Sequence, residues 1–179
     1  MKKFILLATL LIATIASAQK NYTLSDTSTL AIDGSSTLHD WTVTANSMEG
    51  SIAQKEDGSM VDFSVLVEDI EGDRAEAMNS KMHDALKKEA HPKVSVSVSG
   101  LDTSASGKQD LKATLTIAGV EKETTIPATV SQKNGQLQIA GEKKIVLQDY
   151  DIEPPTAMFG TIVVGDEVTV RFDLMFENQ

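Results

Sequence analysis

The hexapeptide Val94–Ser99 reads VSVSVS, so that one apolar residue alternates with one hydroxyl residue throughout. In a β-strand successive side chains point to opposite faces, which would place the valines on one face and the serines on the other. A helical period of 3.6 residues would mix the two residue types on every face. The hexapeptide therefore predicts a half-buried strand, and the same period returns along most of the chain.

Seven further segments follow this alternation, which makes eight predicted strands in all. They cover Thr27–Gly34, Trp41–Ala53, Val61–Glu68, Val94–Leu101, Leu111–Ala118, Glu123–Gln132, Gln136–Val146 and Glu167–Phe176. Turn-forming pairs lie between the apolar stripes and predict antiparallel hairpins, at Asp57-Gly58, Gly119-Val120, Asn134-Gly135 and Gly165-Asp166. The second segment loses its phase after Ala45, so we expect a β-bulge at Asn46-Ser47.

One segment changes to the helical period. Between Arg74 and Ala90 the apolar residues recur every three or four positions, and His91-Pro92 ends the pattern. Asp73 and Glu76 are suited to capping the N-terminus of such a helix. The sequence predicts a single amphipathic helix from Arg74 to about Lys88, whose apolar face, with Met78, Met82 and Leu86, packs against the strands.

The strands could pair as a sandwich or close into a barrel. Closure removes exposed strand edges, so we expect an all-β fold, an eight-stranded antiparallel barrel with one α-helix. Its inward residues are chiefly Val, Ile, Ala and Leu, which would suit a lumen that holds an apolar ligand. A barrel of this size can equally be filled by its own side chains, and the pattern leaves both possibilities open.

The N-terminus has the organisation of a secretory signal peptide over residues 1–18. Lys2 and Lys3 precede the mostly apolar run Phe4–Ile15, and residues 16–18 read ASA, an A-x-A cleavage site. We expect cleavage near Ala18, one mature domain over residues 19–179, and a periplasmic or secreted protein. No later stretch approaches the roughly 20 apolar residues that a membrane-spanning helix needs.

Composition limits the partners of the chain. Its net charge of −10 at pH 7 argues against binding to nucleic acids and to anionic lipid surfaces. The chain has no cysteine, which excludes disulfides and a lipid anchor at the cleavage site. An exported protein of this composition must therefore be stabilised by its core alone.

Three blocks of sequence stand out beyond the alternation: Gly34–Trp41 (GSSTLHDW), Leu115–Lys122 (LTIAGVEK) and Phe159–Val168. With Met82–Lys88 (MHDALKK) and the following His91-Pro92, they resemble the YceI-like family, lipocalin-like bacterial proteins associated with polyisoprenoid binding. The resemblance spans the mature chain. It implies a lipocalin-like barrel with an elongated apolar tunnel that encloses a long isoprenoid or related lipid tail. One departure is that Ala85–Lys93 is lysine-rich, where the best-known members carry an aromatic-rich stretch.

The residues that usually carry catalysis or bind metals do not form recognisable motifs. The three histidines, His39, His83 and His91, show no HxH or HxxxH spacing. A GxSxG elbow, a glycine-rich phosphate loop and a dinucleotide fingerprint are also missing from the sequence. We therefore expect no catalytic residue, no metal and no cofactor.

The prediction for function is an exported, non-enzymatic carrier that binds a long apolar lipid, a polyisoprenoid if the resemblance holds, in the barrel lumen. The residues expected to line the lumen are Trp41, Phe63, Val65, Met78, Met82, Val96, Ile117, Met158, Phe159 and Phe172. Trp41 is either a plug at one barrel end or a lining residue at the tunnel mouth. Two alternatives stay open: a structural or stress-related interaction module with a filled barrel, and a hydrolase or isomerase of lipid substrates.

Overall fold

The computed structural model describes residues 21–55, 58–73, 76–133 and 135–178, so the expected signal peptide over residues 1–18 lies outside the described part. The strands are β1 (Asn21–Leu24), β2 (Thr29–Ser36), β3 (Asp40–Ala45), β4 (Glu49–Ala53), β5 (Ser59–Leu66), β6 (Ile70–Glu71), β7 (Lys93–Leu101), β8 (Gly107–Ile117), β9 (Val120–Lys133), β10 (Gln136–Val146), β11 (Thr156–Ala157) and β12 (Ile162–Asn178). One α-helix, α1 (Glu76–Ala85), and two short 3₁₀ helices, η1 (Val67–Asp69) and η2 (Leu147–Tyr150), complete the elements.

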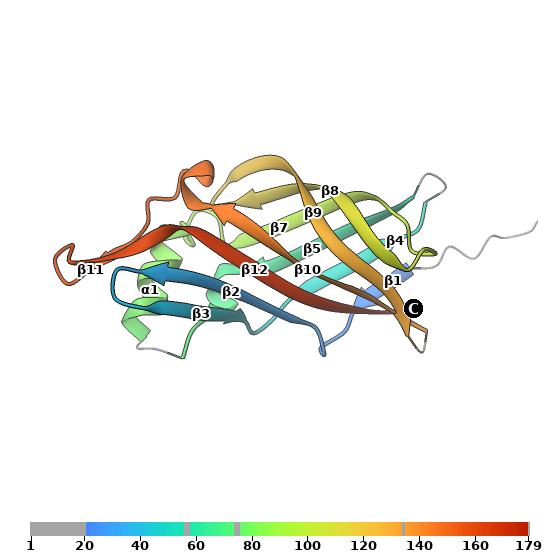
Figure 1. The fold of residues 1–179 in the computed structure, drawn as a ribbon, viewed down its shortest axis with the longest axis horizontal. Coiled ribbons are helices and arrows are strands. Elements are labelled where there is room, and N and C mark those ends of the chain that lie inside the picture. Colours follow the sequence, from blue (N-terminus) through green and yellow to red (C-terminus); the bar gives the residue numbers. More distant parts are fainter. Residues whose placement is uncertain (1–20, 56–57, 74–75, 134, 179) are drawn as a thin grey trace, which may run out of the picture.

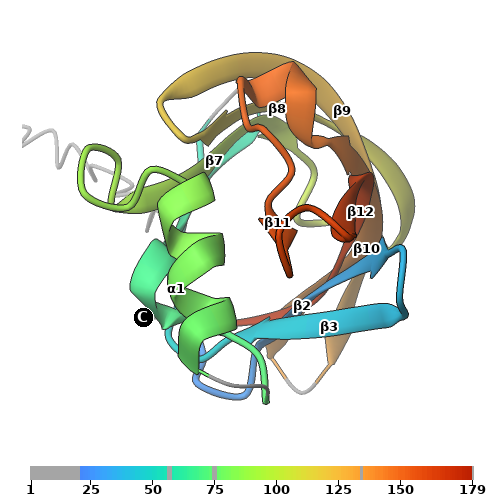
Figure 2. The ribbon, with the colours of Figure 1, turned by 90° about the vertical axis from the view of Figure 1, so that its left-hand side faces the viewer.

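These strands form a closed, eight-stranded antiparallel barrel, which confirms the expected fold (Figures 1 and 2). The ring runs β1-β4-β5-β7-β8-β9-β10-β12 and closes because β1 also pairs with β12. The edge of β12 that pairs with β1 also pairs, further along, with β2. Strand β2 pairs in turn with β3, and β3 pairs with β6. Each of the first three positions around the barrel is therefore shared by two strands. These pairs are β1 and β2, β3 and β4, and β5 and β6.

Where a β-bulge was expected, at Asn46-Ser47, the structure has a break between β3 and β4. The segment predicted as one strand, Trp41–Ala53, ends its first part at Ala45 and resumes at Glu49. Between them the Asn46 amide donates a hydrogen bond of 2.7 Å to the Asp69 carbonyl, in η1 of the neighbouring strand position. The kink lets β3 pair with β2 and β6, while β4 pairs with β1 and β5.

The turn predicted at Gly165-Asp166 is wrong, because both residues lie inside β12. The pairing of β12 with β2 shifts its register between Val164 and Val168, so the loss of alternation marks a β-bulge rather than a reversal of the chain. Gly165 packs closely against β2, and a Cβ there would lie 2.7 Å from the Ser35 hydroxyl oxygen. A glycine in a strand signals a bulge or a close approach as readily as a turn.

Helix α1 ends at Ala85, three residues before the predicted end near Lys88, and the predicted start at Arg74 lies outside the described residues. Lys87 adopts a left-handed conformation with φ of 57°. The Lys88 amide donates to the His83 carbonyl at 3.0 Å, and the Lys87 amide donates to the Asp84 carbonyl at 2.9 Å. This pair of bonds is a Schellman motif, which ends a helix by satisfying its last carbonyls.

The buried residues form two clusters at opposite ends of the barrel. At the plugged end, Ile52, Leu101, Leu137 and Phe176 are completely buried and fill the lumen. At the open end, the second cluster gathers around Ile117, Ile145, Tyr150, Ile152 and Val168. In Figure 1 the plugged end lies near the C-terminus and β1, and the open end carries α1 and β11. Within the described residues no helix is both long enough and apolar enough to span a membrane.

Candidate functional site

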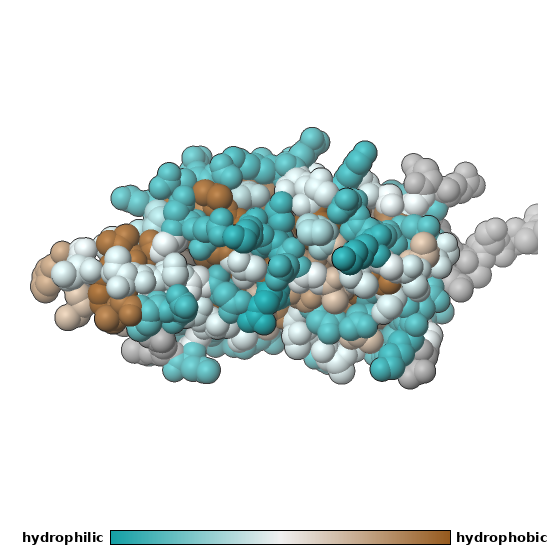
Figure 3. All heavy atoms as spheres, viewed as in Figure 1, coloured by the Kyte–Doolittle hydropathy of each residue, from teal (hydrophilic) through white to brown (hydrophobic). Residues whose placement is uncertain are grey.

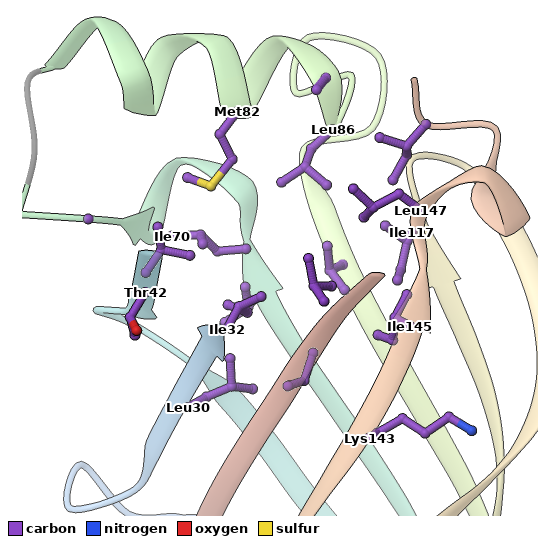
Figure 4. Close-up of a pocket in the computed structure, with 18 of the residues that line it drawn as sticks. Leu30, Ile32, Thr42, Ile70, Met82, Leu86, Ile117, Lys143, Ile145 and Leu147 are labelled. Atoms are coloured by element: carbon purple, nitrogen blue, oxygen red, sulfur yellow. The ribbon is translucent and has the colours of Figure 1, made fainter. Parts of the chain in front are cut away.

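A cavity of about 520 Å³ occupies the lumen between the plugged end and the open end. Its wall takes side chains from every strand position of the barrel, and α1 covers one side of it (Figure 4). The aliphatic and aromatic residues that line it include Leu30, Ile32, Trp41, Val43, Val61, Phe63, Val65, Ile70, Val94, Val96, Val98, Leu111, Leu115, Ile117, Ile126, Ile139, Ile145, Leu147, Ile152, Ile162, Val164, Val168, Val170, Phe172 and Leu174. The site is therefore an apolar pocket of ordinary ligand-binding size.

The alternation that opened the sequence analysis decides which side chains reach this cavity. On β7, Val94, Val96 and Val98 all line it. The intervening Ser95 and Ser97 lie on the outer face, where the Ser97 hydroxyl donates to the Asp62 carboxylate at 3.0 Å. The same strand thus presents an apolar surface to the lumen and a hydrogen-bonding surface to solvent.

Helix α1 covers the cavity without being buried itself. Met82, on the helix, and Leu86, directly after its last residue, point into the cavity, where Leu86 lies near Ile117 and Leu147 (Figure 4). None of the residues described in α1 is fully buried. This helix is therefore a half-exposed cover, because its apolar face meets the cavity rather than a packed core.

Polar contacts attach the same helix to the barrel. The Gly72 amide donates to the Asn79 side-chain oxygen at 3.0 Å, and His83 Nε2 lies 2.9 Å from the Ile70 carbonyl. At the other side of the helix, Lys81 Nζ donates to the Thr156 carbonyl at 2.9 Å. These contacts hold α1 between β6 and β11, across the opening of the barrel.

Trp41 lines the cavity at its open end, on β3. Its indole N–H donates to the Ser35 carbonyl at 3.0 Å, and its ring lies over Gly34, directly opposite on β2. A Cβ at Gly34 would lie 2.1 Å from the ring, so only glycine leaves room for it. Of the two roles considered for Trp41, the structure supports a lining residue at the mouth.

Polar side chains are few in this lining, and the charged ones among the described residues are Lys81 and Lys143. Lys143 Nζ donates to the Thr125 carbonyl at 2.9 Å. This carbonyl lies on β9 just beyond the end of the β9–β10 pairing, whose last β10 residue is Gly141. Neither lysine contacts an acid in the described part of the chain. Both instead satisfy backbone carbonyls at the edges of the apolar wall.

The histidines each have a local role. His83 bonds to the Ile70 carbonyl, His39 Nδ1 lies 3.0 Å from the Asp40 carbonyl, and the His91 ring packs on the turn at Gly119. Over the described residues, His, Asp and Glu form no group of three or more that could hold a metal ion.

Groups with shifted pKa values lie outside the cavity. The Arg171 guanidinium bonded to Asp33 lowers the pKa of that carboxyl, and hydrogen bonds from Ser104 and Ala105 lower the pKa of Asp102. Burial raises the pKa of the Tyr150 hydroxyl. None of these groups lines the cavity.

Nine of the ten residues predicted to line the lumen do line this cavity: Trp41, Phe63, Val65, Met78, Met82, Val96, Ile117, Met158 and Phe172. Phe159 does not, because it lies at the tip of the β11–β12 hairpin and is fully exposed. The prediction missed Leu30 and Ile32, whose alternation in β2 could have revealed them, and Leu147 and Ile152, which lie in an irregular segment without a periodic signal. Whether any of these residues binds a ligand stays a prediction.

Solved structures of similar shape come from three bacteria. A polyisoprenoid-binding domain from Saccharophagus degradans, implicated in plant cell wall breakdown, gives a TM-score of 0.73 at 20% identity, covering 88% of this chain and 98% of that one. BcnA from Burkholderia cenocepacia gives 0.69 at 16% identity, with 83% and 95% covered. The YceI protein of Campylobacter jejuni gives 0.59 at 14% identity, with 74% and 81% covered. These likenesses show a shared fold.

A comparison with curated proteins found no match. The sequence profile described as the YceI-like domain matches residues 22–176, which extend from β1 to β12. The resemblance carried by the three sequence blocks is thereby confirmed, and the chain belongs to the YceI-like family.

Proposed function

We propose that this protein is an exported, non-enzymatic carrier that holds the apolar tail of a polyisoprenoid-type lipid in its barrel. The observation that carries the proposal is the cavity of about 520 Å³ with an almost wholly aliphatic wall. A family neighbour described as a polyisoprenoid-binding domain supports the choice of ligand class.

Burial of hydrocarbon supplies the affinity in such a site. Each methylene group removed from water contributes about 0.8 kcal/mol, so a chain of isoprene units needs no charged contact to be held. A wall of branched Val and Ile side chains selects by length and shape rather than by hydrogen bonding. We therefore expect affinity to rise with the number of isoprene units until the cavity is filled.

The placement of polar groups orients the lipid. The polar residues of the lining include Ser36, His39, Lys81 and Thr156. All four lie at the open end, at the end of β2, in the β2–β3 turn, in α1 and in β11. The plugged end is filled mainly by buried apolar side chains such as Phe176 and Leu137. A lipid would thus enter tail first and keep its headgroup at the mouth, because a polar headgroup is costly to bury without partners.

Export rests on the N-terminal segment alone. The pattern of residues 1–18 supports cleavage after Ala18, so we expect the mature chain to start at Gln19. Intact-mass measurement of protein recovered from the periplasm or medium tests this. A recovered chain that keeps its first eighteen residues would argue against the signal peptide.

Mass spectrometry of lipid extracted from natively purified protein tests the carrier function. We expect a prenyl lipid in the wild-type protein and none in Ile117→Lys, whose lysine would lie on the cavity wall. Since Trp41 is the only tryptophan and lines the cavity, its emission also reports occupancy. It should change on addition of geranylgeraniol and less on addition of the shorter farnesol.

The matched comparison uses a linear alcohol with the carbon number of geranylgeraniol. Equal affinity for both would indicate a general lipid carrier and would contradict the polyisoprenoid preference. Absence of any extracted lipid, together with no change in Trp41 emission, would contradict the carrier function and favour the filled-barrel interaction module.

A further inference from the structure

The open end of the barrel carries a small exposed apolar surface, which we call the mouth tip: Leu38, Met158, Phe159 and Val163. Their exposed fractions are 65%, 69%, 112% and 40%. Leu38 comes from the β2–β3 turn, and the other three come from the β11–β12 hairpin. Figure 3 shows apolar residues gathered at this end of the molecule, beyond the more polar flank of the barrel.

Hydrogen bonds join the two loops that make the mouth tip. The Thr37 amide donates to the Val163 carbonyl at 3.0 Å, and the Thr37 hydroxyl donates to the Thr161 carbonyl at 3.2 Å. The Val163 amide in turn donates to the Thr37 hydroxyl at 3.2 Å. Leu38 is therefore held beside the hairpin, and the four apolar side chains form one surface.

Folding does not explain the residue types at the hairpin turn. Met158 and Phe159 both adopt left-handed backbone conformations, with φ of 51° and 57°. Glycine, asparagine and aspartate occupy such positions at lower conformational cost than large side chains do. Here the positions carry large apolar residues that none of the described residues covers, which is typical of a surface that meets a partner.

Charge is also distributed in a way that sets the mouth tip apart. Residues 154–165 and 34–39 contain no Asp, Glu, Lys or Arg, although 23% of the whole chain is charged. The projecting loops thus avoid the carboxylates that would repel a lipid headgroup region and would be costly to bring close to hydrocarbon.

The mouth tip is continuous with the cavity. Met158 contributes to both, and the adjoining Ile162 and Val164 line the cavity. Seen from the open end, β11 lies in front of the barrel opening (Figure 2). A lipid leaving a bilayer at the mouth tip would therefore pass from one apolar environment to another.

We propose that the mouth tip inserts into the surface of a lipid bilayer and places the cavity mouth against the membrane during loading or release. The proposal rests on the proposed carrier function. A bilayer fits better than a protein partner, because a stable protein interface takes about 20–30 residues a side and this projection offers four apolar side chains. Shallow insertion of a few apolar and aromatic side chains is how peripheral proteins bind at bilayer interfaces.

Flotation with phosphatidylcholine vesicles tests the proposal. The protein used starts at Gln19, because the apolar run Phe4–Ile15 would itself bind vesicles and the whole described barrel lies within residues 21–178. We expect the wild type to float and Phe159→Ser with Leu38→Ser to lose about tenfold or more of its vesicle partitioning. Val146→Ser removes an equally apolar, 38% exposed residue on the outer face of β10 and should float as the wild type does.

A second measurement separates docking from ligand binding. Neither Phe159 nor Leu38 lines the cavity, so the double variant should show the same change in Trp41 emission on addition of geranylgeraniol as the wild type does. It should extract geranylgeraniol from vesicles more slowly than the wild type. The combination of unchanged binding, lost flotation and slow extraction supports the mouth tip as a membrane-docking surface.

The contrary outcomes are distinct. If the wild type binds geranylgeraniol but never floats, docking is overturned while the carrier function stands. Equal flotation of the double variant and the wild type would overturn the role of these residues. Stronger flotation with vesicles of phosphatidylethanolamine and phosphatidylglycerol, abolished by high salt, would assign attachment to lysines and also overturn the proposal.

Discussion

The two ends of the barrel are built by the same strands with the same alternation, yet one is solid and the other is hollow. On β12, Phe176 is completely buried at the plugged end, whereas Phe172, four residues earlier on the same face, lines the cavity. Alternation decides which side chains point inward. It does not decide whether those side chains meet across the lumen.

What differs between the ends is how the ring is completed. At the plugged end β1 pairs with both β4 and β12, so hydrogen-bonded strands surround Ile52 and Leu137 on all sides. At the open end β3 pairs with β6 over two residue pairs only, and α1 covers the remaining opening. A helix resting on side chains leaves more space than a paired strand would, so the lumen stays open there.

The largest effect should follow from placing the same charge at the two ends. Leu137→Asp would bury a carboxylate in a fully packed cluster, at a cost of several kcal/mol that prevents folding. Val96→Asp would place it on the cavity wall, where water can reach it, so the protein should fold but lose its lipid. Circular dichroism and mass spectrometry of extracted lipid measure the two outcomes.

Two outcomes for this pair of variants would contradict the difference between a hollow open end and a packed plugged end. A folded Val96→Asp protein that still carries lipid would show that the cavity is not the binding site. A folded, cooperative Leu137→Asp protein would show that the plugged end is less well packed than its complete burial indicates.

Truncation of the two phenylalanines on β12 should give the next largest effect. Phe176→Ala removes a completely buried ring and should cost about 3–5 kcal/mol of unfolding free energy. Phe172→Ala removes a ring that already borders the cavity, so its cost should be clearly smaller, while affinity for geranylgeraniol should change more. Urea unfolding and Trp41 titration measure both. Equal costs would mean that the cavity is as tightly packed as the plug.

Much of the barrel was predictable from local pattern. Val94–Ser99 forms part of β7 with its valines inward, and the loss of phase at Asn46-Ser47 marks the break between β3 and β4, although a bulge was expected there. The pattern failed where one local signal has two physical causes: Gly165-Asp166 indicates a turn or a bulge, and only the pairing of β12 with β2 distinguishes them. The helix end was missed because a lysine, not a glycine, holds the left-handed position of the Schellman motif.

The site was less predictable than the fold. Most of the predicted lining residues line the cavity because alternation reports direction, whereas Phe159 was assigned by its apolar character alone and is exposed. The space that Gly34 leaves for Trp41, and the choice between a filled and a hollow lumen, depend on contacts between strands that local sequence does not contain. Tertiary packing decides such features.

Mutations in and next to α1, which covers the open end, should lower the free energy of unfolding less than mutations at the plugged end do. Leu86 directly follows α1 and is half-buried on the cavity side, so Leu86→Ala should cost about 1–2 kcal/mol, less than full burial of a leucine would imply. Lys87→Gly should not destabilise the protein, because glycine favours the left-handed conformation that Lys87 adopts. Thermal unfolding compares the two. A negligible effect of Leu86→Ala, matched with unchanged lipid affinity, would show that α1 is not docked on the cavity.

The smallest effect concerns the outer wall near the open end, where Asp33 on β2 joins Arg171 on β12 and accepts a hydrogen bond of 2.7 Å from the Thr42 hydroxyl on β3. These contacts lower the pKa of Asp33, with the Arg171 bond as the main cause. Because the folded pKa of Asp33 lies below the unfolded one, its contribution to stability is fully present above the unfolded value of about 3.9. The contribution is lost as the pH falls through the folded value.

Asp33→Asn should therefore reduce stability slightly at pH 7, and the difference from the wild type should shrink in strong acid. The effect is small because Arg171 is largely exposed, with 55% of its side chain accessible, so solvent and salt screen the pair. A double-mutant cycle with Arg171→Met, followed by urea unfolding across this pH range, measures it, and a difference that grows towards low pH would contradict the assignment.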